Sequence, residues 1–247
     1  MPTGLGGERL WLCPSLDDSP DDISGNGYNG TYVGGMATVS DTGEGGVRAY
    51  EHDVVSKGIT LPADLGMTAD DGTISIWVYS DSAQSSTNVF QYIGAYDQTY
   101  TNSNPVFYTF GNNSTMADRT QSPNAIPELD VESTISYLAW KHFCMTKESG
   151  VYKVYLDGSL AATSATFTGD LSFHTTVPWA IGKGFFNSFT GMSDDARIFN
   201  RVIDQTEITY LATSRGITGS PYGTATNYSP FRNAKYINKT YHIPRFG

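Results

Sequence analysis

At residues 151–160 the chain reads Val-Tyr-Lys-Val-Tyr-Leu-Asp-Gly-Ser-Leu. Apolar and mixed side chains alternate up to Leu156, which is the period-two pattern of a strand that buries one face. Asp157-Gly158 is a strong hairpin signal, so we expect Leu156 and Leu160 on adjacent strands. The same alternation recurs at residues 73–79, Thr-Ile-Ser-Ile-Trp-Val-Tyr. Both stretches predict an antiparallel sheet with one buried face.

The rest of the chain repeats this rhythm. Turn-forming residues recur at a spacing of about 8–12 residues between short β-branched and aromatic runs, and helical periodicity is nearly absent. This pattern is typical of an all-β sandwich. Strands are expected at Arg9–Cys13, Gly30–Val33, Val47–His52, Gly58–Leu61, Thr73–Ser80, Val89–Ala95, Val106–Gly111, Glu128–Ser133, Trp140–Thr146, Tyr152–Leu156, Leu160–Ser164, Trp179–Gly182 and Ala196–Phe199.

One helix is predicted, over Asp204–Ser214. Asp204 is the expected N-cap, and Glu207, three residues later, completes a capping box. Ile208, Leu211 and Ala212 provide the apolar stripe, and Gly216 follows as a stop signal.

Composition limits the possible functions. The chain has 247 residues, and sandwiches of about 200–250 residues commonly form one domain, so we expect one body over residues 1–216. The formal net charge is −10, which argues against general nucleic-acid binding. A hydrophobic content of 39% is enough for a core. No run approaches the roughly 18 apolar residues of a membrane helix.

The N-terminus shows no secretory signal pattern, and the cysteines show no disulfide or metal-binding pattern. Residues 1–8 lack the basic and apolar regions of a secretory signal, and with Met1 present we expect a product used without export. Cys13 and Cys144 have no metal-ligand spacing and form no disulfide framework, so both are expected to be buried strand residues.

Residues 217–247 have a different composition from the body. Glu207 is the last acidic residue of the chain, so this segment is basic as well as rich in aromatic residues and chain breakers. We interpret it as an extended arm that folds over its own body, docks onto a neighbouring subunit, or remains a free tail. The expected contact residues are Tyr222, Tyr228, Phe231, Arg232, Lys235, Tyr236, Lys239, Tyr241, Arg245 and Phe246.

Three segments occur in a diagnostic order. Leu-Trp-Leu at 10–12 precedes Asp-Ile-Ser-Gly-Asn-Gly-Tyr-Asn-Gly-Thr at 22–31; Trp-Lys-His-Phe at 140–143 leads to the hairpin; and Gly-Met-Ser-Asp-Asp-Ala-Arg-Ile-Phe-Asn-Arg at 191–201 precedes the helix. This set resembles the laminin-G-like, concanavalin A-type jelly-roll family. The resemblance implies a concanavalin A-like jelly-roll β-sandwich with one short C-terminal helix, followed here by the arm.

The resemblance also implies a calcium site, because members of this family often hold one Ca²⁺ between the opening turn and the closing strand. The matching carboxylates are Asp22 and Asp194 or Asp195. Calcium takes about six to eight oxygen ligands, to which a Gly-rich turn can add carbonyls. In the alternative interpretation Asp22 caps its own turn, and Asp195 pairs with Arg197 in a carboxylate fork.

The sequence Glu128-Leu129-Asp130-Val131-Glu132 resembles the catalytic strand of laminarinase-like glucanases. Period-two alternation would place its three carboxylates on one face. However, the strand beginning at Trp140 follows at once, whereas a long stretch separates the two in those enzymes. We therefore expect a solvated edge strand without catalysis. No histidine has a metal or nucleophile signature, and His142 is expected to be packed and hydrogen-bonded.

Aromatic and amide side chains gather in polar segments expected at the sandwich rim, where binding loops lie. We expect glycan contacts from Tyr96, Tyr100, Asn102, Asn104 and Asn112. The alternative for the neighbouring tyrosines, including Tyr92, is a place in the core.

These observations predict a non-enzymatic structural or binding protein. The favoured role is a virion component, such as a capsid decoration or tail-associated protein, which docks to protein partners through its arm and touches host glycans. The alternative is a stand-alone carbohydrate-binding module of a surface or secreted adhesin, with an extracellular or cell-surface location. A glucanase ranks third.

Overall fold

The structure is a computed structural model of the 247-residue chain. It describes residues 5–14, 19–40, 48–52, 57–67, 71–81, 89–94, 106–110, 113–117, 128–134, 138–166, 175–182, 187–188 and 190–215.

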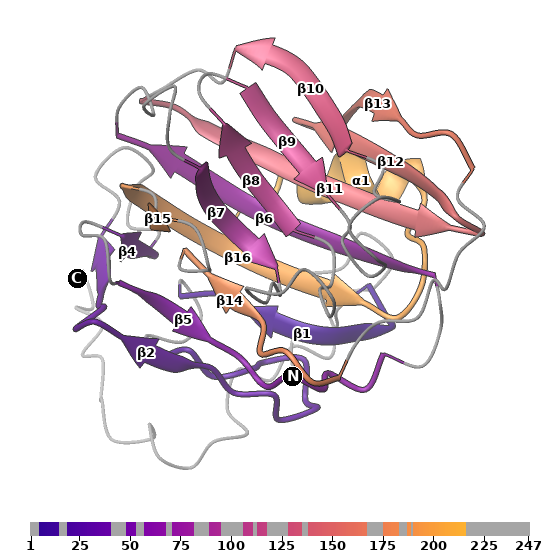
Figure 1. Ribbon diagram of the computed structural model, residues 1–247. Helices are drawn as coiled ribbons and strands as arrows, with labels where there is room; N and C mark the ends of the chain where they lie inside the picture. Colours follow the sequence, from indigo (N-terminus) through magenta and orange to yellow (C-terminus); the bar gives the residue numbers. More distant parts are fainter. Residues whose placement is uncertain are drawn as a thin grey trace, which may run out of the picture.

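Two sheets face each other (Figure 1). Sheet A has the order β13-β12-β11-β6-β16-β4-β3, with β1 also pairing with β16. Its strands are β1 (Glu8–Leu12), β3 (Thr38–Ser40), β4 (Arg48–His52), β6 (Gly72–Ser80), β11 (Trp140–Glu148), β12 (Val151–Leu156), β13 (Ser159–Thr163) and β16 (Gly191–Phe199).

Sheet B has the order β10-β9-β8-β7-β14-β5-β2, and β15 pairs with β7. Its strands are β2 (Thr31–Val33), β5 (Gly58–Thr60), β7 (Val89–Gly94), β8 (Val106–Phe110), β9 (Asn113–Ala117), β10 (Glu128–Thr134), β14 (Ala180–Ile181) and β15 (Asn187–Ser188). Each described pairing is antiparallel except that of β15 with β7. The predicted all-β sandwich is confirmed.

The hairpin at 151–160 forms as predicted. Leu156 pairs with Ser159, and Tyr155 pairs with Leu160 on the neighbouring strand. Asp157 and Gly158 have φ angles of 49° and 81°. Two successive left-handed residues are what a two-residue hairpin turn requires, because they match the right-handed twist of the strands.

The apolar face of each sheet is buried between the two layers. Ile74, Ile76 and Val78 of β6 alternate into this core, where they meet Ile93 and Ile181 of sheet B. Tyr92 is 1% exposed and belongs to the same core, which confirms the core interpretation for this residue.

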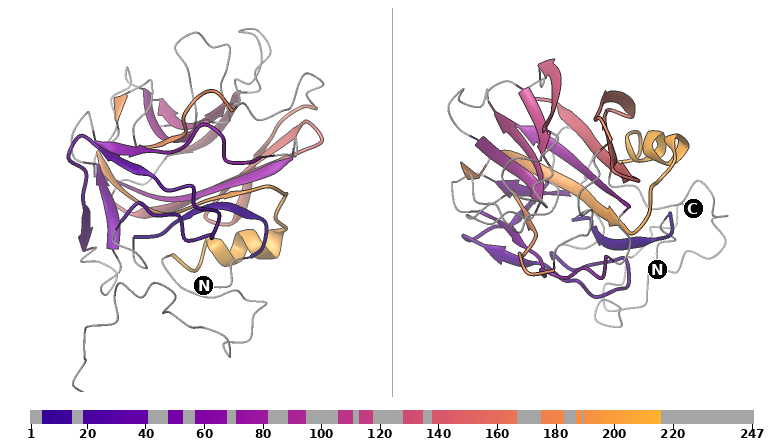
Figure 2. Two further views of the ribbon diagram at one scale, coloured as in Figure 1. Left: turned by 90° about the horizontal axis from the view of Figure 1, so that it is seen from below. Right: turned by 45° about the vertical axis from the view of Figure 1, so that its right-hand side comes forward.

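A second apolar cluster lies on the outer face of sheet A, under α1 (Gln205–Leu211). Figure 2 shows α1 outside the two layers. Ile208 and Leu211 of the helix pack with Cys144, Tyr155 and Phe199 of the sheet. Sheet A is therefore covered on both faces here, which is why β11 and β16 are buried along almost their whole length.

The capping box of α1 is present as predicted. The Asp204 carboxylate accepts the Glu207 amide, and the Glu207 carboxylate accepts the Asp204 amide, at 2.9 Å each. The helix is shorter than predicted, with Ala212 as its C-cap. In the described part of the chain, no helix has the length and apolar character needed to cross a membrane.

Some elements differ from the prediction. The short strands β3, β9 and β15 were not predicted, and β16 begins at Gly191 rather than Ala196. A bulge between Asp194 and Arg197 breaks the register of β16, with Asp195 at a φ of 46°. Cys144 is buried in β11 as expected, but Cys13, although buried, lies just beyond β1.

Candidate functional site

The opening turn is built around Asp22. Its Oδ1 accepts the amides of Trp11 and Ser24 at 3.0 and 2.9 Å, and its Oδ2 accepts the Ser24 hydroxyl and the Tyr28 amide at 2.8 and 3.1 Å. The carboxylate thus ties β1 to the turn and closes the turn on itself. These contacts are those of the alternative interpretation, in which Asp22 is a local cap.

Asp195 belongs to a buried ion-pair network with Arg197. The Arg197 Nε and Nη2 donate to the two Asp195 oxygens at 2.9 and 3.1 Å, which confirms the predicted fork. Trp11 Nε1 also donates to Asp195 at 2.6 Å, and the guanidinium stacks 3.9 Å from the Trp11 ring. Burial lowers the pKa of Arg197, but Asp195, followed by Cys13 and Glu8, outweighs it, so the net shift is upward.

The Asp194 carboxylate pairs with a different arginine. Its Oδ2 accepts Arg215 Nη1 at 3.2 Å, and the Arg215 guanidinium lies 3.8 Å from the Trp140 ring. Burial, and then the neighbouring Asp195, raises the pKa of Asp194 well above its usual range, against the opposing effect of Arg215. This contact fixes Arg215, the last described residue, to the outer face of sheet A.

Each of the three predicted calcium ligands therefore accepts hydrogen bonds from the protein itself. Trp11 connects two of them, through its amide to Asp22 and its indole to Asp195. Among the described residues, no three His, Cys, Asp or Glu side chains gather as a metal-binding group. Calcium binding stays a prediction, and the contacts of these carboxylates are those of structural caps and ion pairs.

His142 is packed and hydrogen-bonded, as predicted. Its Nε2 lies 2.8 Å from the Ser75 hydroxyl and its ring is 5.3 Å from that of Trp77. Its Nδ1 is buried and has no partner in the described structure. Burial lowers its pKa to about 3, helped by Arg197 and opposed by Asp157. With no orienting carboxylate at Nδ1, this pair lacks the third member of a catalytic triad.

The predicted glycan contacts, Tyr96, Tyr100, Asn102, Asn104 and Asn112, lie outside the described residues, and so do the ten arm residues. The strands that flank the glycan set are described. Gly94 and Val106, on either side of 95–105, pair at one end of sheet B. Phe110 and Asn113, on either side of 111–112, pair at the other end of β8, about 14 Å away along the strand. The set is thus attached at two opposite ends of the sandwich.

The Glu-x-Asp-x-Glu strand is β10, the last strand of sheet B. Its register with β9 is regular from Glu128 to Val131 and then shifts before Thr134. Glu132 lies within the stretch over which the register is irregular. The edge position predicted for this strand is confirmed.

Two groups at the opening turn were not singled out from the sequence. Arg9 of β1 and Tyr28 have side-chain polar atoms that face Gly66, a residue remote from both in sequence. No sequence motif joins the three, because the fold alone brings them together.

Comparisons with known proteins agree with this architecture. The family model that matches the chain describes the concanavalin A-like lectin/glucanases superfamily and covers residues 53–209. One similar structure is domain 4 of AbnA, a GH43 extracellular arabinanase from Geobacillus stearothermophilus, in complex with arabinotriose. It is 22% identical with a TM-score of 0.64, over 83% of this chain and 98% of that chain.

The binding domain of botulinum neurotoxin DC is also similar. Its complexes with rat synaptotagmin II and with SialylT are 16% and 15% identical to this chain, each with a TM-score of 0.66. Both matches cover 84% of this chain but 51% of the toxin domain, so the chain spans about half of that domain's length. No curated protein matches the chain. At these identities the likeness is one of fold.

Proposed function

Because the chain belongs to the concanavalin A-like lectin/glucanases superfamily, we propose that it is a non-catalytic carbohydrate-binding domain. One observation carries this proposal: domain 4 of AbnA, solved with arabinotriose, matches this chain over 98% of its own length. The match therefore concerns a whole domain of this fold with an oligosaccharide bound.

The position of β10 supports a binding role over hydrolysis. Retaining and inverting glycosidases need two carboxyl groups held at a defined separation, about 5–9.5 Å, across one sugar. β10 is the last strand of its sheet, and its pairing with β9 is irregular between Val131 and Thr134, the stretch that contains Glu132. An irregular edge strand is poorly suited to hold such a fixed spacing. The buried carboxylates of β16 are already bonded to arginines and a tryptophan.

We place the glycan at the rim where β7 and β8 meet the 95–105 segment. Gly94 pairs with Ala180, Ala180 with Thr60, and Thr60 with Thr31, so one row of strand ends joins this segment to the opening turn. Four of the five predicted glycan contacts belong to this end. Asn112 belongs to the segment at the opposite end of β8 and therefore provides a control.

The test is a glycan array followed by calorimetry on the full chain. Tyr96→Ala and Asn102→Ala are expected to weaken binding about tenfold or more, because stacking and amide hydrogen bonds supply most of a small sugar's affinity. Asn112→Ala is expected to bind like the parent. Failure of the parent to bind any glycan would refute the proposal.

Hydrolysis is tested separately. We expect no new reducing ends when the chain is incubated with laminarin, and unchanged glycan affinity for Glu128→Gln together with Glu132→Gln. Turnover that this double substitution abolishes would instead identify β10 as a catalytic strand.

A role in a larger assembly is the second candidate, most specifically as a virion component with the arm as its docking device. The favouring observation is that Arg215, the last described residue before the predicted arm, is held on sheet A by Asp194 and Trp140. Light scattering of the full chain and of a truncation ending at Gly216 tests this role. Self-association of the full chain alone would support docking between copies, and two identical monomers would count against it.

A further inference from the structure

Among the described residues, none is a hydrogen-bond or ion-pair partner of the Arg9 guanidinium. In the described part of the chain, Arg48, Arg197, Arg201 and Arg215 each donate to an oxygen of the protein. The buried Nε of Arg9 has no acceptor there, and its remaining N–H groups make no described hydrogen bond or ion pair. Buried donors are nearly always satisfied, so an unsatisfied guanidinium needs an explanation.

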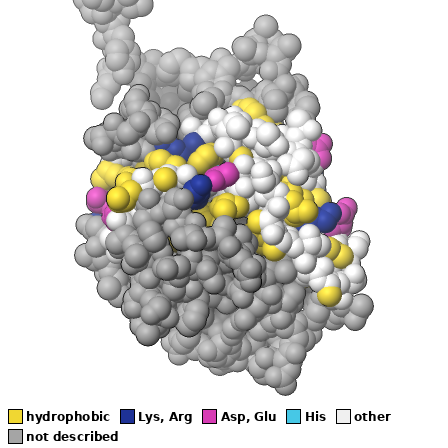
Figure 3. Space-filling view, turned by 90° about the horizontal axis from the view of Figure 1, so that it is seen from above, with side chains coloured by type: hydrophobic (Ala, Val, Ile, Leu, Met, Phe, Trp, Pro, Cys, Tyr) yellow, Lys and Arg dark blue, Asp and Glu magenta, His cyan; other side chains and the backbone are white. Residues whose placement is uncertain are grey.

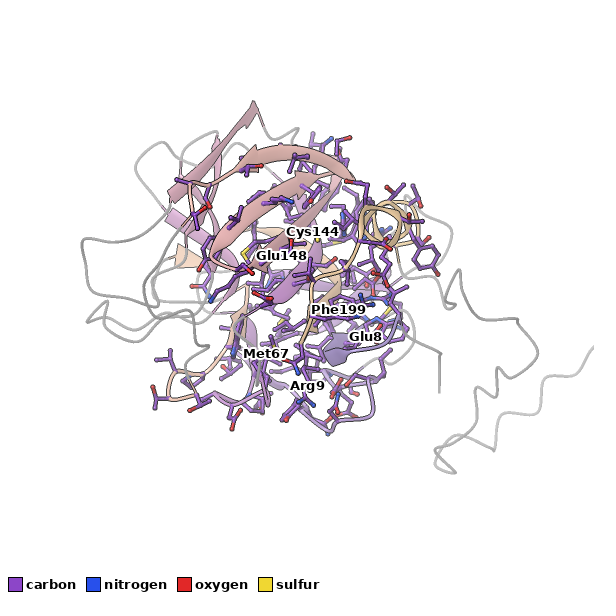
Figure 4. All side chains as sticks on the ribbon, turned by 90° about the vertical axis from the view of Figure 1, so that its right-hand side faces the viewer. Glu8, Arg9, Met67, Cys144, Glu148 and Phe199 are labelled. Carbon is purple, nitrogen blue, oxygen red and sulfur yellow. The ribbon has the colours of Figure 1, made fainter. Side chains whose placement is uncertain are left out.

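A second polar group faces the same place. The Tyr28 ring packs partly against the core between the sheets, while its hydroxyl makes no hydrogen bond to any described residue. A Cβ added to Gly66 would lie 2.5 Å from the Tyr28 hydroxyl and 3.6 Å from both Cζ and Nη2 of Arg9. Because Gly66 has no side chain, the Tyr28 hydroxyl can occupy this position, with the Arg9 guanidinium beside it. Figure 4 shows Arg9 beside Met67, the residue that follows Gly66.

The nearby carboxylates are bonded elsewhere. Glu8 accepts the amides of Leu5 and Gly6, Asp22 accepts the four donors of its turn, and Asp64 accepts the Gly66 amide at 2.7 Å. Arg9 is thus close to acidic residues without pairing with any of the described ones. No described residue accepts from its Nε, so the guanidinium is open to an acceptor from outside the chain.

This place lies at the proposed glycan rim. Tyr28 precedes β2 and Gly66 follows β5, and the adjoining strand ends, Thr31 and Thr60, pair with each other. The same row of strand ends continues through Ala180 to Gly94, where the 95–105 segment begins.

We infer that Arg9 and Tyr28 bind the carboxylate of an acidic sugar. A guanidinium presents a fork of N–H groups that matches the two oxygens of a carboxylate, and a phenolic hydroxyl adds a further donor. In a chain of net charge −10, one arginine suits a singly charged group better than a dianion. The inference rests on the proposed function, because the carboxylate arrives as part of a glycan.

The test compares acidic glycans with their uncharged analogues on the full chain. The probes are 3′-sialyllactose with lactose, and trigalacturonate with its methyl ester. The variants are Arg9→Gln and Tyr28→Phe. Lys153→Gln, on β12, removes the same charge from a different part of the surface and is the control.

We expect each carboxylated probe to bind about tenfold or more tightly than its neutral analogue, because a charge-assisted bidentate contact is worth that much. Arg9→Gln removes this preference, Tyr28→Phe reduces it several-fold, and Lys153→Gln leaves it unchanged. Which acid binds better distinguishes a sialic from a uronic acid.

Two outcomes overturn the inference, and they can be told apart. If the neutral sugars bind as well as the acidic ones, and Arg9→Gln changes neither, the carboxylate site is wrong while the carbohydrate-binding function stands. If no probe and no arrayed glycan binds, both are wrong. Circular dichroism of the variants ensures that a loss of binding is not a loss of fold.

Discussion

At the scale of single residues, His52 of β4 in sheet A lies against the backbone of Gly182, which follows β14 in sheet B. The Nε2 of His52 is 2.8 Å from the Ser193 hydroxyl, and the imidazole is fully buried. A Cβ at Gly182 would lie 2.0 Å from two atoms of that ring. The two sheets can approach here only because residue 182 has no side chain.

Gly182→Ala is therefore expected to destabilise the fold strongly, by about 3 kcal/mol or more, because the ring must move and break its buried hydrogen bond. Gly35→Ala is the matched control: its φ of 73° is close to the 70° of Gly182, but nothing lies within 4 Å of its added Cβ. Gly35→Ala should lower the free energy of unfolding only by the strain of an alanine in the left-handed conformation, about 1–2 kcal/mol. Urea unfolding measures both, and equal losses would disprove the close approach.

His142 provides a prediction about pH. Its folded-state pKa, lowered by burial to about 3, is below the 6.5 expected for the unfolded chain. Its contribution to stability is therefore complete above pH 6.5 and is lost as pH falls toward 3, because only the unfolded chain takes up the proton. Protonation of the folded state would place a charge in a fully buried position.

The free energy of unfolding is measured from pH 7.5 to 4 for the parent and for His142→Gln, which retains a hydrogen-bonding group for Ser75. The parent should lose stability more steeply below pH 6.5, by up to about 1.4 kcal/mol per pH unit. Parallel curves would contradict the lowered pKa.

At the scale of elements, α1 is too short to be stable alone, since isolated helices need about 12–15 residues. It persists because of its capping box, its two apolar anchors and the Arg201 guanidinium. Arg201 donates to both Glu207 oxygens, at 2.6 and 2.8 Å. The Glu207 carboxylate thus serves the helix start and an ion pair together, and its pKa is lowered mainly by Arg201.

Asp204→Ala is expected to cost about 1 kcal/mol or more, because it removes the acceptor of the Glu207 amide. Asp204→Ser restores a capping oxygen and should recover most of the loss. Thermal unfolding measures both variants. A serine variant as unstable as the alanine variant would mean that the cap hydrogen bond is not the source of the effect.

The elements differ in how well the sequence predicted them. β6 and β12 alternate cleanly and were placed within one residue of their bounds. The first half of β16 was missed because Ser193, Asp194 and Asp195 are too polar for a buried strand by pattern alone. They are buried because His52, Arg215 and Arg197 bond to them. Those partners cannot be identified from local sequence.

At the scale of the whole molecule, the described residues on the face seen from above form no large patch of one charge (Figure 3). Viewed from above, hydrophobic side chains are interspersed with single basic and acidic groups (Figure 3). This mixed surface is consistent with specific contacts at the rim rather than general attraction of a charged polymer.

Calcium gives a prediction at this scale, because its expected ligands come from opposite ends of the chain. Trp11 holds Asp22 and Asp195 as hydrogen-bond acceptors, and Arg215 holds Asp194. We therefore expect the same melting temperature in calcium chloride as in EGTA, because a ligand that does not bind the folded state cannot stabilise it. A rise that scales with calcium concentration would show that these carboxylates exchange their protein donors for the ion.

The sequence by itself determined the sandwich class, the hairpin at 151–160, the cap of α1 and the edge role of β10. These depend on side-chain periodicity and on turn or cap chemistry within a few residues. The tertiary structure alone decided the use of the carboxylates and the position of Arg9 beside Tyr28 and Gly66. Whether Asp22 caps a turn, or Arg9 lacks an acceptor, depends on residues brought close by pairing β1 with β16 and β2 with β5. Side-chain periodicity and secondary-structure propensity are local properties of the sequence. Whether a polar group finds a hydrogen-bond partner depends on the whole folded sandwich.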